Sequence, residues 1–301
     1  MSEEEVTYPV TKEELTTLRE GLAKEFPDDH KNISDVYVES IASKPYSKDP
    51  TIRRPLEYSA EKLKDLMNWR KENATHLPEL LSLAKGGESA PAAVEQPEKF
   101  AKAKAMAAAY NLGAIYWHGL DKQGRPILWI RTNRLPWFPD VESQINVIIH
   151  MADVGINLMP EGLTDFVCIA DSHSPPPPHP QFMLNLLSAL MKGYPDRLYH
   201  LVSCPVGSIM QTIMNLCLPL MPTRLSSKIV LISKEDAKKK MGDMLLNGED
   251  DIPTFLDGTA DHDQFYPDKG TVNDGLLKFD YDGMIERLTE AVKKFESKEE
   301  E

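Results

Sequence analysis

The most constraining feature of the sequence is a long uncharged stretch, Leu201 to Thr223, in a chain that is 27% charged. A membrane-spanning helix needs about 20 consecutive apolar residues. Pro205 and Pro219, however, confine any continuous helix here to residues 206–218, which would rise only about 20 Å. The stretch is therefore predicted to belong to a folded domain and not to cross a membrane.

The helix predicted after Pro205 has two unequal faces. One narrow stripe is polar but uncharged, formed by Ser208, Gln211, Thr212 and Asn215. The remaining perimeter is apolar, formed by Ile209, Met210, Ile213, Met214, Leu216, Cys217, Leu218 and Leu220. An ordinary surface helix buries one apolar face. This helix therefore has more apolar surface than a single core contact would use.

Length and charge limit the function classes that fit. A chain of 301 residues can build a sizeable core in one large domain or two modest ones. The formal net charge of −13 disfavours nucleic acid as a partner. Part of this charge sits in terminal tails, at residues 3–5 and 296–301. The folded body is therefore expected to be able to approach an anionic membrane.

The cysteines and the N-terminus favour an intracellular setting. Cys168, Cys204 and Cys217 each lie in an apolar run, and none has CxxC spacing, so neither disulfides nor a zinc site is expected. Residues 1–10 have neither the basic flank nor the apolar core of a secretory signal. These features predict a cytoplasmic protein.

Periodicity predicts an α/β fold with a mixed, mainly parallel sheet covered by helices. The helical patterns cover residues 12–25, 59–71 with Ser59 as cap, a turn near Leu80, 98–110, 141–158, 181–192, 208–218 and 281–298. Strand patterns cover residues 114–119, 126–131, 166–170, 198–202 and 228–232, the first two flanking a turn. We expect an N-terminal helical lobe over residues 1–105, an α/β domain over 106–260 and a C-terminal extension with a helix over 261–301.

Signatures of common enzymes are absent from the sequence: it has no GxSxG, GxGxxG, Walker or HExxH motif. One polar group follows a predicted strand, where α/β sheets often bind ligands, namely Asp171, His173 and His179. An esterase or metal-dependent enzyme using these residues is the alternative to a binding function. The other interpretation is a solvated loop stiffened by Pro175–Pro178.

Two further segments allow two interpretations each. Trp137 and Phe138 are expected to cover the core, with insertion into a membrane interface as the alternative. The basic run at residues 234–240 fits a solvated helix face or contact with anionic lipid headgroups.

Three motifs, in order, resemble the CRAL-TRIO family of lipid-binding and lipid-transfer proteins. DKQGRPILWIR at residues 121–131 is similar to the family's D-x-x-G-R-P strand, and residues 194–232 to its Y-P-E-R-L strand, gate helix and K-I strand. IPTFLDGT at residues 252–259 looks like its closing motif. The pair Trp69 and Arg70 resembles part of the family's helical lobe, so the likeness covers roughly residues 50–260.

The resemblance implies a monomer that holds one phospholipid or other hydrophobic molecule in an internal cavity and exchanges it between membranes. It implies transient peripheral association with membranes, no catalytic or metal residues, and no cofactor besides the bound lipid. The helix after Pro205 would be the gate, with acyl-chain contacts from Ile209, Met210, Ile213, Met214 and Cys217. A lipid-sensing regulatory module is a further alternative.

The headgroup positions depart from the family pattern. Asp196 and Lys228 stand where phosphatidylinositol-transferring members have Glu and Lys. Phe166 and Cys168 stand where those members have two hydroxyl residues. Because an inositol ring needs several hydrogen-bond partners, the sequence predicts a preference for phosphatidylcholine or a less polar lipid.

Overall fold

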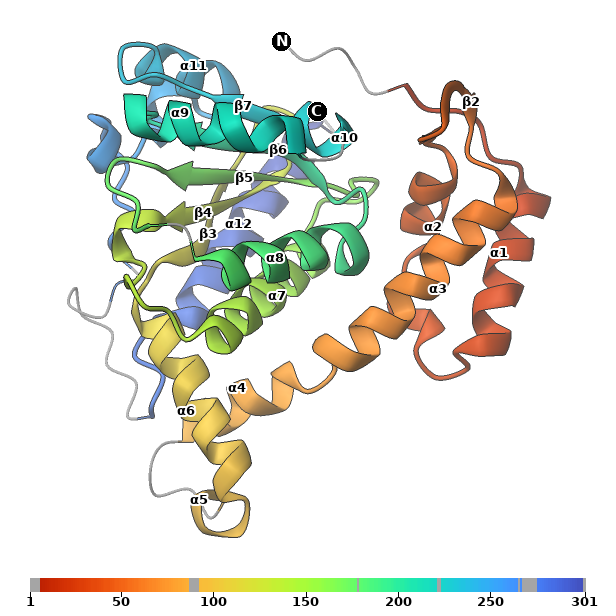
Figure 1. The fold of residues 1–301 in the computed structure, drawn as a ribbon, viewed down its shortest axis with the longest axis horizontal. Helices are drawn as coiled ribbons and strands as arrows, with labels where there is room; N and C mark the ends of the chain where they lie inside the picture. Colours follow the sequence, from red (N-terminus) through yellow and green to blue (C-terminus); the bar gives the residue numbers. More distant parts are fainter. Residues whose placement is uncertain are drawn as a thin grey trace. The chain divides into compact units, whose positions relative to one another are not determined.

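The chain folds into two compact units, shown in Figure 1 in a computed structural model that describes residues 6–86, 92–177, 179–220, 223–264, 266 and 275–299. The first unit contains Met1–Thr75, Gly162–Thr164 and Leu187–Arg197. The second contains His76–Glu161, Asp165–Leu186 and Leu198–Glu301. The chain therefore leaves the second unit and returns to it more than once.

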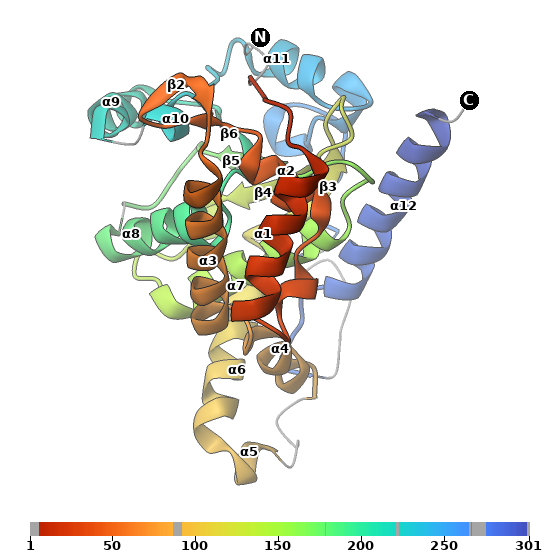
Figure 2. The same ribbon diagram turned by 90° about the vertical axis from the view of Figure 1, so that its right-hand side faces the viewer.

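The first unit is built on helices. Its elements are α1 (Lys12–Glu25), η1 (His30–Asn32), α2 (Asp35–Ala42), the short hairpin β1 (Pro45–Tyr46) and β2 (Asp49–Arg53), α3 (Leu56–Asn73) and the π-helical turn η3 (Ala189–Gly193). Helix α1 begins where expected because Thr11 and Glu14 form a reciprocal capping box. Helices α1 and α3 lie side by side (Figures 1 and 2). Between them and α2 lies an apolar core that includes Leu18, Leu22, Val38, Ile41, Leu63 and Leu66.

The second unit is built on a five-stranded sheet in the order β3-β4-β5-β6-β7. The strands are β3 (Ile115–Leu120), β4 (Pro126–Arg131), β5 (Phe166–Asp171), β6 (Leu198–Cys204) and β7 (Ile229–Leu231). Strands β3 and β4 pair antiparallel, and every later pair is parallel. This confirms the predicted mixed, mainly parallel sheet.

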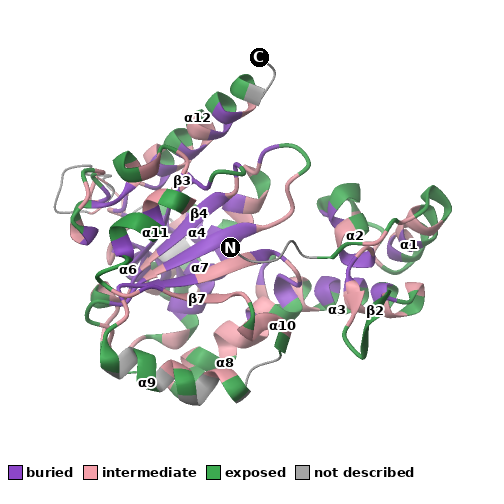
Figure 3. Cartoon of the chain, turned by 90° about the horizontal axis from the view of Figure 1, so that it is seen from above, coloured by how far each residue is buried: buried purple, intermediate pink, exposed green. Residues whose placement is uncertain are grey.

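The second unit also contains helices, some of which cover the sheet. They are α4 (Leu77–Gly86), α5 (Ala92–Glu95), α6 (Pro97–Asn111), α7 (Val141–Asn157), α8 (Pro180–Ser188), α9 (Ser208–Cys217), α10 (Thr223–Ser226), α11 (Ala237–Met244) and α12 (Tyr281–Glu299). Short 3₁₀ turns η2 (Thr132–Arg134), η4 (Leu218–Leu220), η5 (Gly248–Asp251) and η6 (Thr254–Leu256) connect them. Figures 1 and 3 show α8 and α9 on the side of the sheet opposite α12. No described helix has both the length and the apolar character needed to span a bilayer.

Two local expectations differ from the structure. Ser59 does not cap a helix: α3 starts at Leu56, directly after Pro55, and the buried Ser59 hydroxyl donates to the Pro55 carbonyl. Proline fits this boundary because the first helical amide groups need no partner within the helix. The first unit also ends at Thr75, before the expected boundary at residue 105, because α4 packs against α6 and α7.

Trp137 and Phe138 do not cover the core, contrary to the sequence-based expectation. Their exposed fractions are 70% and 89%, the latter among the highest of the large apolar side chains described. They lie between η2 and α7, with Pro136 before them and Pro139 after them. The two prolines restrict the backbone there, and α7 begins only at Val141, after its cap residue Asp140.

A cluster of two histidines packs on one face of the sheet, with His262 buried and His118 partly buried. The Tyr116 hydroxyl lies 3.1 Å from Nδ1 of His262, and the His118 and His262 rings lie 3.9 Å apart. Trp129 and Phe255 present ring contacts to His262 from the other sides. Burial lowers the pKa of His262 to about 2 and that of His118 to about 4. Both imidazoles are therefore neutral at physiological pH.

Acidification from pH 7 to pH 5 is expected to destabilise the second unit through His262. The unfolded chain binds a proton near pH 6.5 that the folded chain binds only near pH 2, so stability falls as the pH drops below 6.5. The loss at pH 5 is about 2 kcal/mol for this one group. Urea unfolding at both pH values measures it. His262→Gln, which does not titrate, should lose about 2 kcal/mol less than wild type, and an equal loss in both would contradict the assignment.

Candidate functional site

The two faces of the sheet are distinguished by strand register. Cys168 of β5 pairs with Leu128 of β4 and Leu201 of β6, so these three side chains share a face. The same face continues through Trp117 of β3, whose indole nitrogen donates to the Met151 carbonyl of α7 at 2.7 Å. We call this the α7 face.

The opposite face carries the histidine cluster. Tyr116 and Trp129 are register partners on this face, and both contact His262. The charge of Arg287 in α12 acts on His118, which also lies on this face. Because α8 and α9 lie on the side opposite α12, they stand over the α7 face (Figures 1 and 3).

Both faces carry buried side chains, but one part of the α7 face is more exposed. On the histidine face, the side chains of the inner strands are fully buried at Ile127, Trp129, Val167, Ile169 and Val202. On the α7 face, a row of apolar side chains is only partly buried, namely Ile130, Ala170, Leu201, Ile229 and Leu231. We call these five residues the apolar row.

Partial exposure of the apolar row is unusual for its position. Strand β7 is an edge strand, so exposure of Ile229 and Leu231 has an ordinary explanation. Ile130, Ala170 and Leu201, however, lie on inner, parallel-paired strands. Both faces of such strands are normally covered. The apolar row is therefore an apolar contact surface that the described side chains leave partly open.

The polar groups of this face are few and already paired. Ser203 of β6 shares the face with Ala170, and its hydroxyl lies 2.5 Å from that of Ser172. Both serines are buried. The surface therefore suits contact with hydrocarbon better than recognition of a charged or polyhydroxylated group.

Helix α9 has the exposure pattern that its sequence predicts on its polar side. Ser208, Gln211, Thr212 and Asn215 are all exposed, and Met214 is partly buried. The side chains of Ile209, Met210, Ile213 and Cys217 lie outside the described residues. The polar stripe thus faces solvent, and the predicted acyl-chain contacts of α9 stay predictions.

Asp196 belongs to the first unit and forms an ion pair there. Its carboxylate accepts from Arg54 Nη1 at 2.6 Å and Nη2 at 3.3 Å, with 8% and 3% of the two side chains exposed. The Tyr37 hydroxyl donates to the neighbouring Pro195 carbonyl at 2.6 Å, and the Arg197 guanidinium lies 3.3 Å from the centre of the Tyr37 ring. These contacts fix the segment that precedes β6 in the first unit.

Lys228 lies directly before β7 in the second unit. Its ammonium donates to the Leu198 carbonyl at 2.5 Å, and its own carbonyl accepts from Leu201 N at 2.9 Å. The side chain therefore joins the beginnings of β6 and β7. A role for Lys228 toward a lipid headgroup stays a prediction.

Phe166 and Cys168 lie on the α7 face but are buried, with 3% and 6% exposed. The Phe166 ring contacts Trp117 edge-on at 5.4 Å between centres. Burial raises the pKa of the Cys168 thiol to about 12, so it stays protonated. Neither side chain supplies a hydroxyl, and Phe166 is part of the packed core.

The residues of the alternative enzymatic group form hydrogen bonds with Arg131 and with nearby backbone amides. Asp171 Oδ2 accepts from Arg131 Nε at 3.1 Å, on the histidine face, and Asp171 Oδ1 accepts from the backbone amide of His173. His179 Nδ1 accepts from the backbone amide of Phe182. Within the described part of the chain, no three His, Cys, Asp or Glu side chains form a metal-binding group.

Two sets of site residues escaped the sequence analysis. The apolar row could have been found from the alternation of side chains along each strand, once the covered face was known. Arg125 is the second, and its sequence position in DKQGRP does not reveal its partners. Its Nε donates to Asp165 at 2.7 Å and its guanidinium lies 3.7 Å from the centre of the Tyr199 ring, so it braces the starts of β4, β5 and β6.

Comparisons with known proteins agree with this architecture. A family model described as CRAL/TRIO domain matches residues 110–258. No curated protein matches the chain by sequence. A solved structure titled "Crystal structure of Sfh5" is similar with a TM-score of 0.50 at 15% identity, covering 78% of this chain and 83% of that chain, which shows likeness of fold. CRAL-TRIO proteins bind hydrophobic lipid ligands. Residues 110–258 are thus a CRAL/TRIO domain, and the chain belongs to the CRAL-TRIO family.

Proposed function

We propose that this protein holds a single lipid against the apolar row, with α9 as a movable gate, and transfers it between membranes. The observation that carries the proposal is the partial exposure of Ile130, Ala170 and Leu201 on inner strands of the sheet. Acyl chains placed on these side chains would complete the cover that a parallel sheet normally has.

The energy of an acyl chain in water explains why a gate is needed. Burial of each methylene stabilises by about 0.8 kcal/mol, so a chain of about 15 methylenes costs on the order of 12 kcal/mol to expose. Helix α9 suits this role because it contains no charged residue and presents its polar stripe to solvent. Such a helix can exchange one apolar environment for another without desolvating a charge.

The expected headgroup preference follows from the hydrogen-bonding side chains at the headgroup positions. Phe166 and Cys168 replace two hydroxyl partners, and Asp196 is already bonded to Arg54. An inositol ring would leave several hydroxyls without partners, each costing about 1–3 kcal/mol. We propose phosphatidylcholine or a less polar lipid as the ligand, with Lys228 as the candidate contact to a phosphate.

Lipid extraction tests the function directly. Protein purified from a heterologous host is extracted and analysed by mass spectrometry, then assayed for transfer between donor and acceptor vesicles. One lipid per protein, and faster transfer of phosphatidylcholine than of phosphatidylinositol, are expected. Protein that neither carries nor accepts any lipid would overturn the proposal. Preferential loading of phosphatidylinositol would refute the headgroup assignment alone. Stoichiometric loading without transfer would instead favour the sensing module.

Trp137 and Phe138 are proposed to insert into the membrane during docking. Both are large, adjacent and exposed, and aromatic side chains are favoured at the interface between headgroups and acyl chains. Replacing both by serine should weaken binding to phosphatidylcholine vesicles about tenfold or more, since partial burial of two aromatics contributes about 2 kcal/mol.

Vesicle co-sedimentation measures this effect. Val94→Ser is the matched control, because Val94 is also an exposed apolar residue, at 87%, but its sequence neighbours are Ala93 and Glu95 and not a second aromatic. Its binding should equal that of wild type. Unchanged binding of the Trp137→Ser, Phe138→Ser double variant would refute a docking role for this pair.

A further inference from the structure

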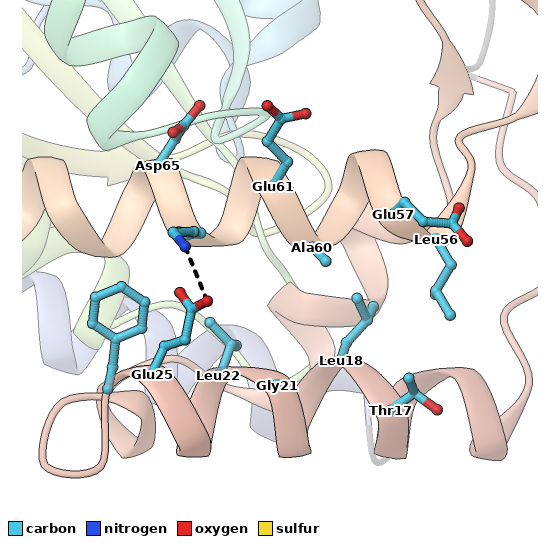
Figure 4. Close-up of a pocket in the computed structure, with 12 residues that line it drawn as sticks. Thr17, Leu18, Gly21, Leu22, Glu25, Leu56, Glu57, Ala60, Glu61 and Asp65 are labelled. Atoms are coloured by element: carbon cyan, nitrogen blue, oxygen red, sulfur yellow. Dashed lines mark hydrogen bonds and ion pairs between the residues drawn. The ribbon is translucent and has the colours of Figure 1, made fainter.

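The first unit contains a groove between α1 and α3 with a volume of about 560 Å³ (Figure 4). It is open to solvent along one side, and its base is apolar. The residues of the base are Leu18, Leu22, Phe26 and Leu56. This groove is lined by the first unit alone and shares no residue with the apolar row.

The α3 side of the groove is acidic, and the α1 side has a glycine at its centre. On the α3 wall, Glu57, Glu61 and Asp65 follow one another at intervals of four residues, all exposed. Figure 4 shows Glu61 and Asp65 projecting from α3 on the side away from α1. On the α1 side, Gly21 lies opposite Ala60, and neither residue carries a long side chain. The carboxylates of Glu61 and Asp65 therefore lie along the outer rim of the groove.

The space beside Gly21 is open. A Cβ placed on this residue would meet no other atom within 4 Å. Glycine is disfavoured in the interior of a helix, and nothing in the packing of the first unit requires it at this position. The absence of a side chain here allows the backbone of another helix to approach α1 closely.

Charge decides what kind of occupant fits. Among the residues that line the groove, four are acidic and Lys64 is basic, and Lys64 pairs with Glu25 at 2.9 Å. The wall of three further carboxylates repels an anionic lipid surface or a nucleic acid and attracts cations. A second copy of this chain carries a net charge of −13 and would be repelled in general.

We propose that the α1/α3 groove binds a basic amphipathic helix of a partner protein. Apolar side chains of that helix would contact Phe26 and Leu56, the partly buried residues of the base, and its Lys or Arg residues would pair with Glu57, Glu61 and Asp65 at the rim. This is recognition of a helix by a groove, which uses apolar anchors spaced by three or four residues. The groove would thus recruit the protein to a partner independently of its bound lipid.

A designed peptide pair tests the proposal on the full chain. The first is a capped amphipathic helix of about 16 residues made of Leu, Ala and Lys, long enough to be helical when bound. The second has Glu in place of every Lys. Fluorescence anisotropy measures binding of each labelled peptide at low and high salt. The Lys peptide should bind and weaken with salt, while the Glu peptide should not bind.

Two variants locate the site. Gly21→Leu fills the groove and Glu61→Lys reverses a wall charge, and each should weaken binding of the Lys peptide at least tenfold. Thr16→Leu and Glu39→Lys make the same kinds of change at exposed positions outside the groove and should stay within twofold of wild type. Circular dichroism checks that all four variants fold, and a second groove variant, Ala60→Leu, replaces Gly21→Leu if that one does not.

Several outcomes would overturn the proposal. The first is equal binding of the Lys and Glu peptides. The second is Lys-peptide binding that neither groove variant changes. Self-association of the wild-type chain that Gly21→Leu abolishes would assign the groove to a second copy instead. Vesicle binding that Gly21→Leu abolishes would assign it to a membrane.

Discussion

Replacing Arg54 by methionine should lower the free energy of unfolding of the first unit by about 3–5 kcal/mol. Arg54 donates to both carboxylate oxygens of Asp196 and to the Ile41 carbonyl at 2.9 Å, and its side chain is almost fully buried. Methionine fills much of the same volume but removes the guanidinium that pairs with a buried carboxylate and a buried carbonyl. Removing one partner of a buried ion pair costs more than the intact pair contributes.

Denaturant unfolding, followed by fluorescence of Trp69, measures the change, because Trp69 contacts Tyr194 within the same unit. Adding Asp196→Asn to Arg54→Met should restore much of the loss by removing the charge. Asparagine tolerates the positive φ of 62° at this position. Lys64→Met breaks an exposed ion pair and should cost about 1 kcal/mol or less. If Arg54→Met lowers the free energy of unfolding by no more than Lys64→Met does, the buried pair contributes little to stability.

The same ion pair shows why the domain boundaries could not be predicted from the sequence. Arg54 and Asp196 are separated by 142 positions, and their contact places Leu187–Arg197 in the first unit. Sequence patterns report local periodicity, and nothing local to Asp196 reveals a distant arginine. The segment was therefore assigned to the α/β domain together with the strand that follows it.

Helices and strands whose sequence pattern lies within the element itself were predicted well. Helix α1 agrees with its predicted range because a capping box and an amphipathic repeat coincide. The strands of the sheet are short apolar runs between turns, and all five begin within one position of the expected residue. Helix α2 escaped prediction because its eight residues span too few turns to show a periodic pattern.

For the candidate site, the sequence predicts an apolar ligand, and the site residues it names stay predictions. The uncharged segment indicated an apolar ligand, and the family resemblance supplied Asp196 and Lys228 as headgroup residues. Both are bonded to partners that no pattern shows, a distant guanidinium and the backbone carbonyl of Leu198. The apolar row depends on which face α7, α8 and α9 cover, and this is a property of the whole fold.

Replacing Ala170 by aspartate should reduce lipid loading at least a hundredfold. Ala170 lies in the middle of the apolar row on β5, between Ile130 and Ser203 in register. Without lipid, the partial exposure of this position lets a carboxylate stay hydrated, so the fold is expected to persist. A lipid bound on the apolar row would desolvate that carboxylate without providing a hydrogen-bond partner, at a cost of several kcal/mol. A difference of about 2.8 kcal/mol is already a factor of 100.

Loading is measured by mass spectrometry of extracted lipid and by vesicle transfer, with circular dichroism to establish folding. Thr212→Asp is the matched control, because it adds the same charge on the exposed polar stripe of α9 and should leave loading within twofold of wild type. Leu231→Asp, on the edge strand β7, repeats the test if Ala170→Asp does not fold. If a folded Ala170→Asp protein still loads lipid as wild type does, the ligand does not lie on the apolar row. The partial exposure of these inner strands would then need another explanation.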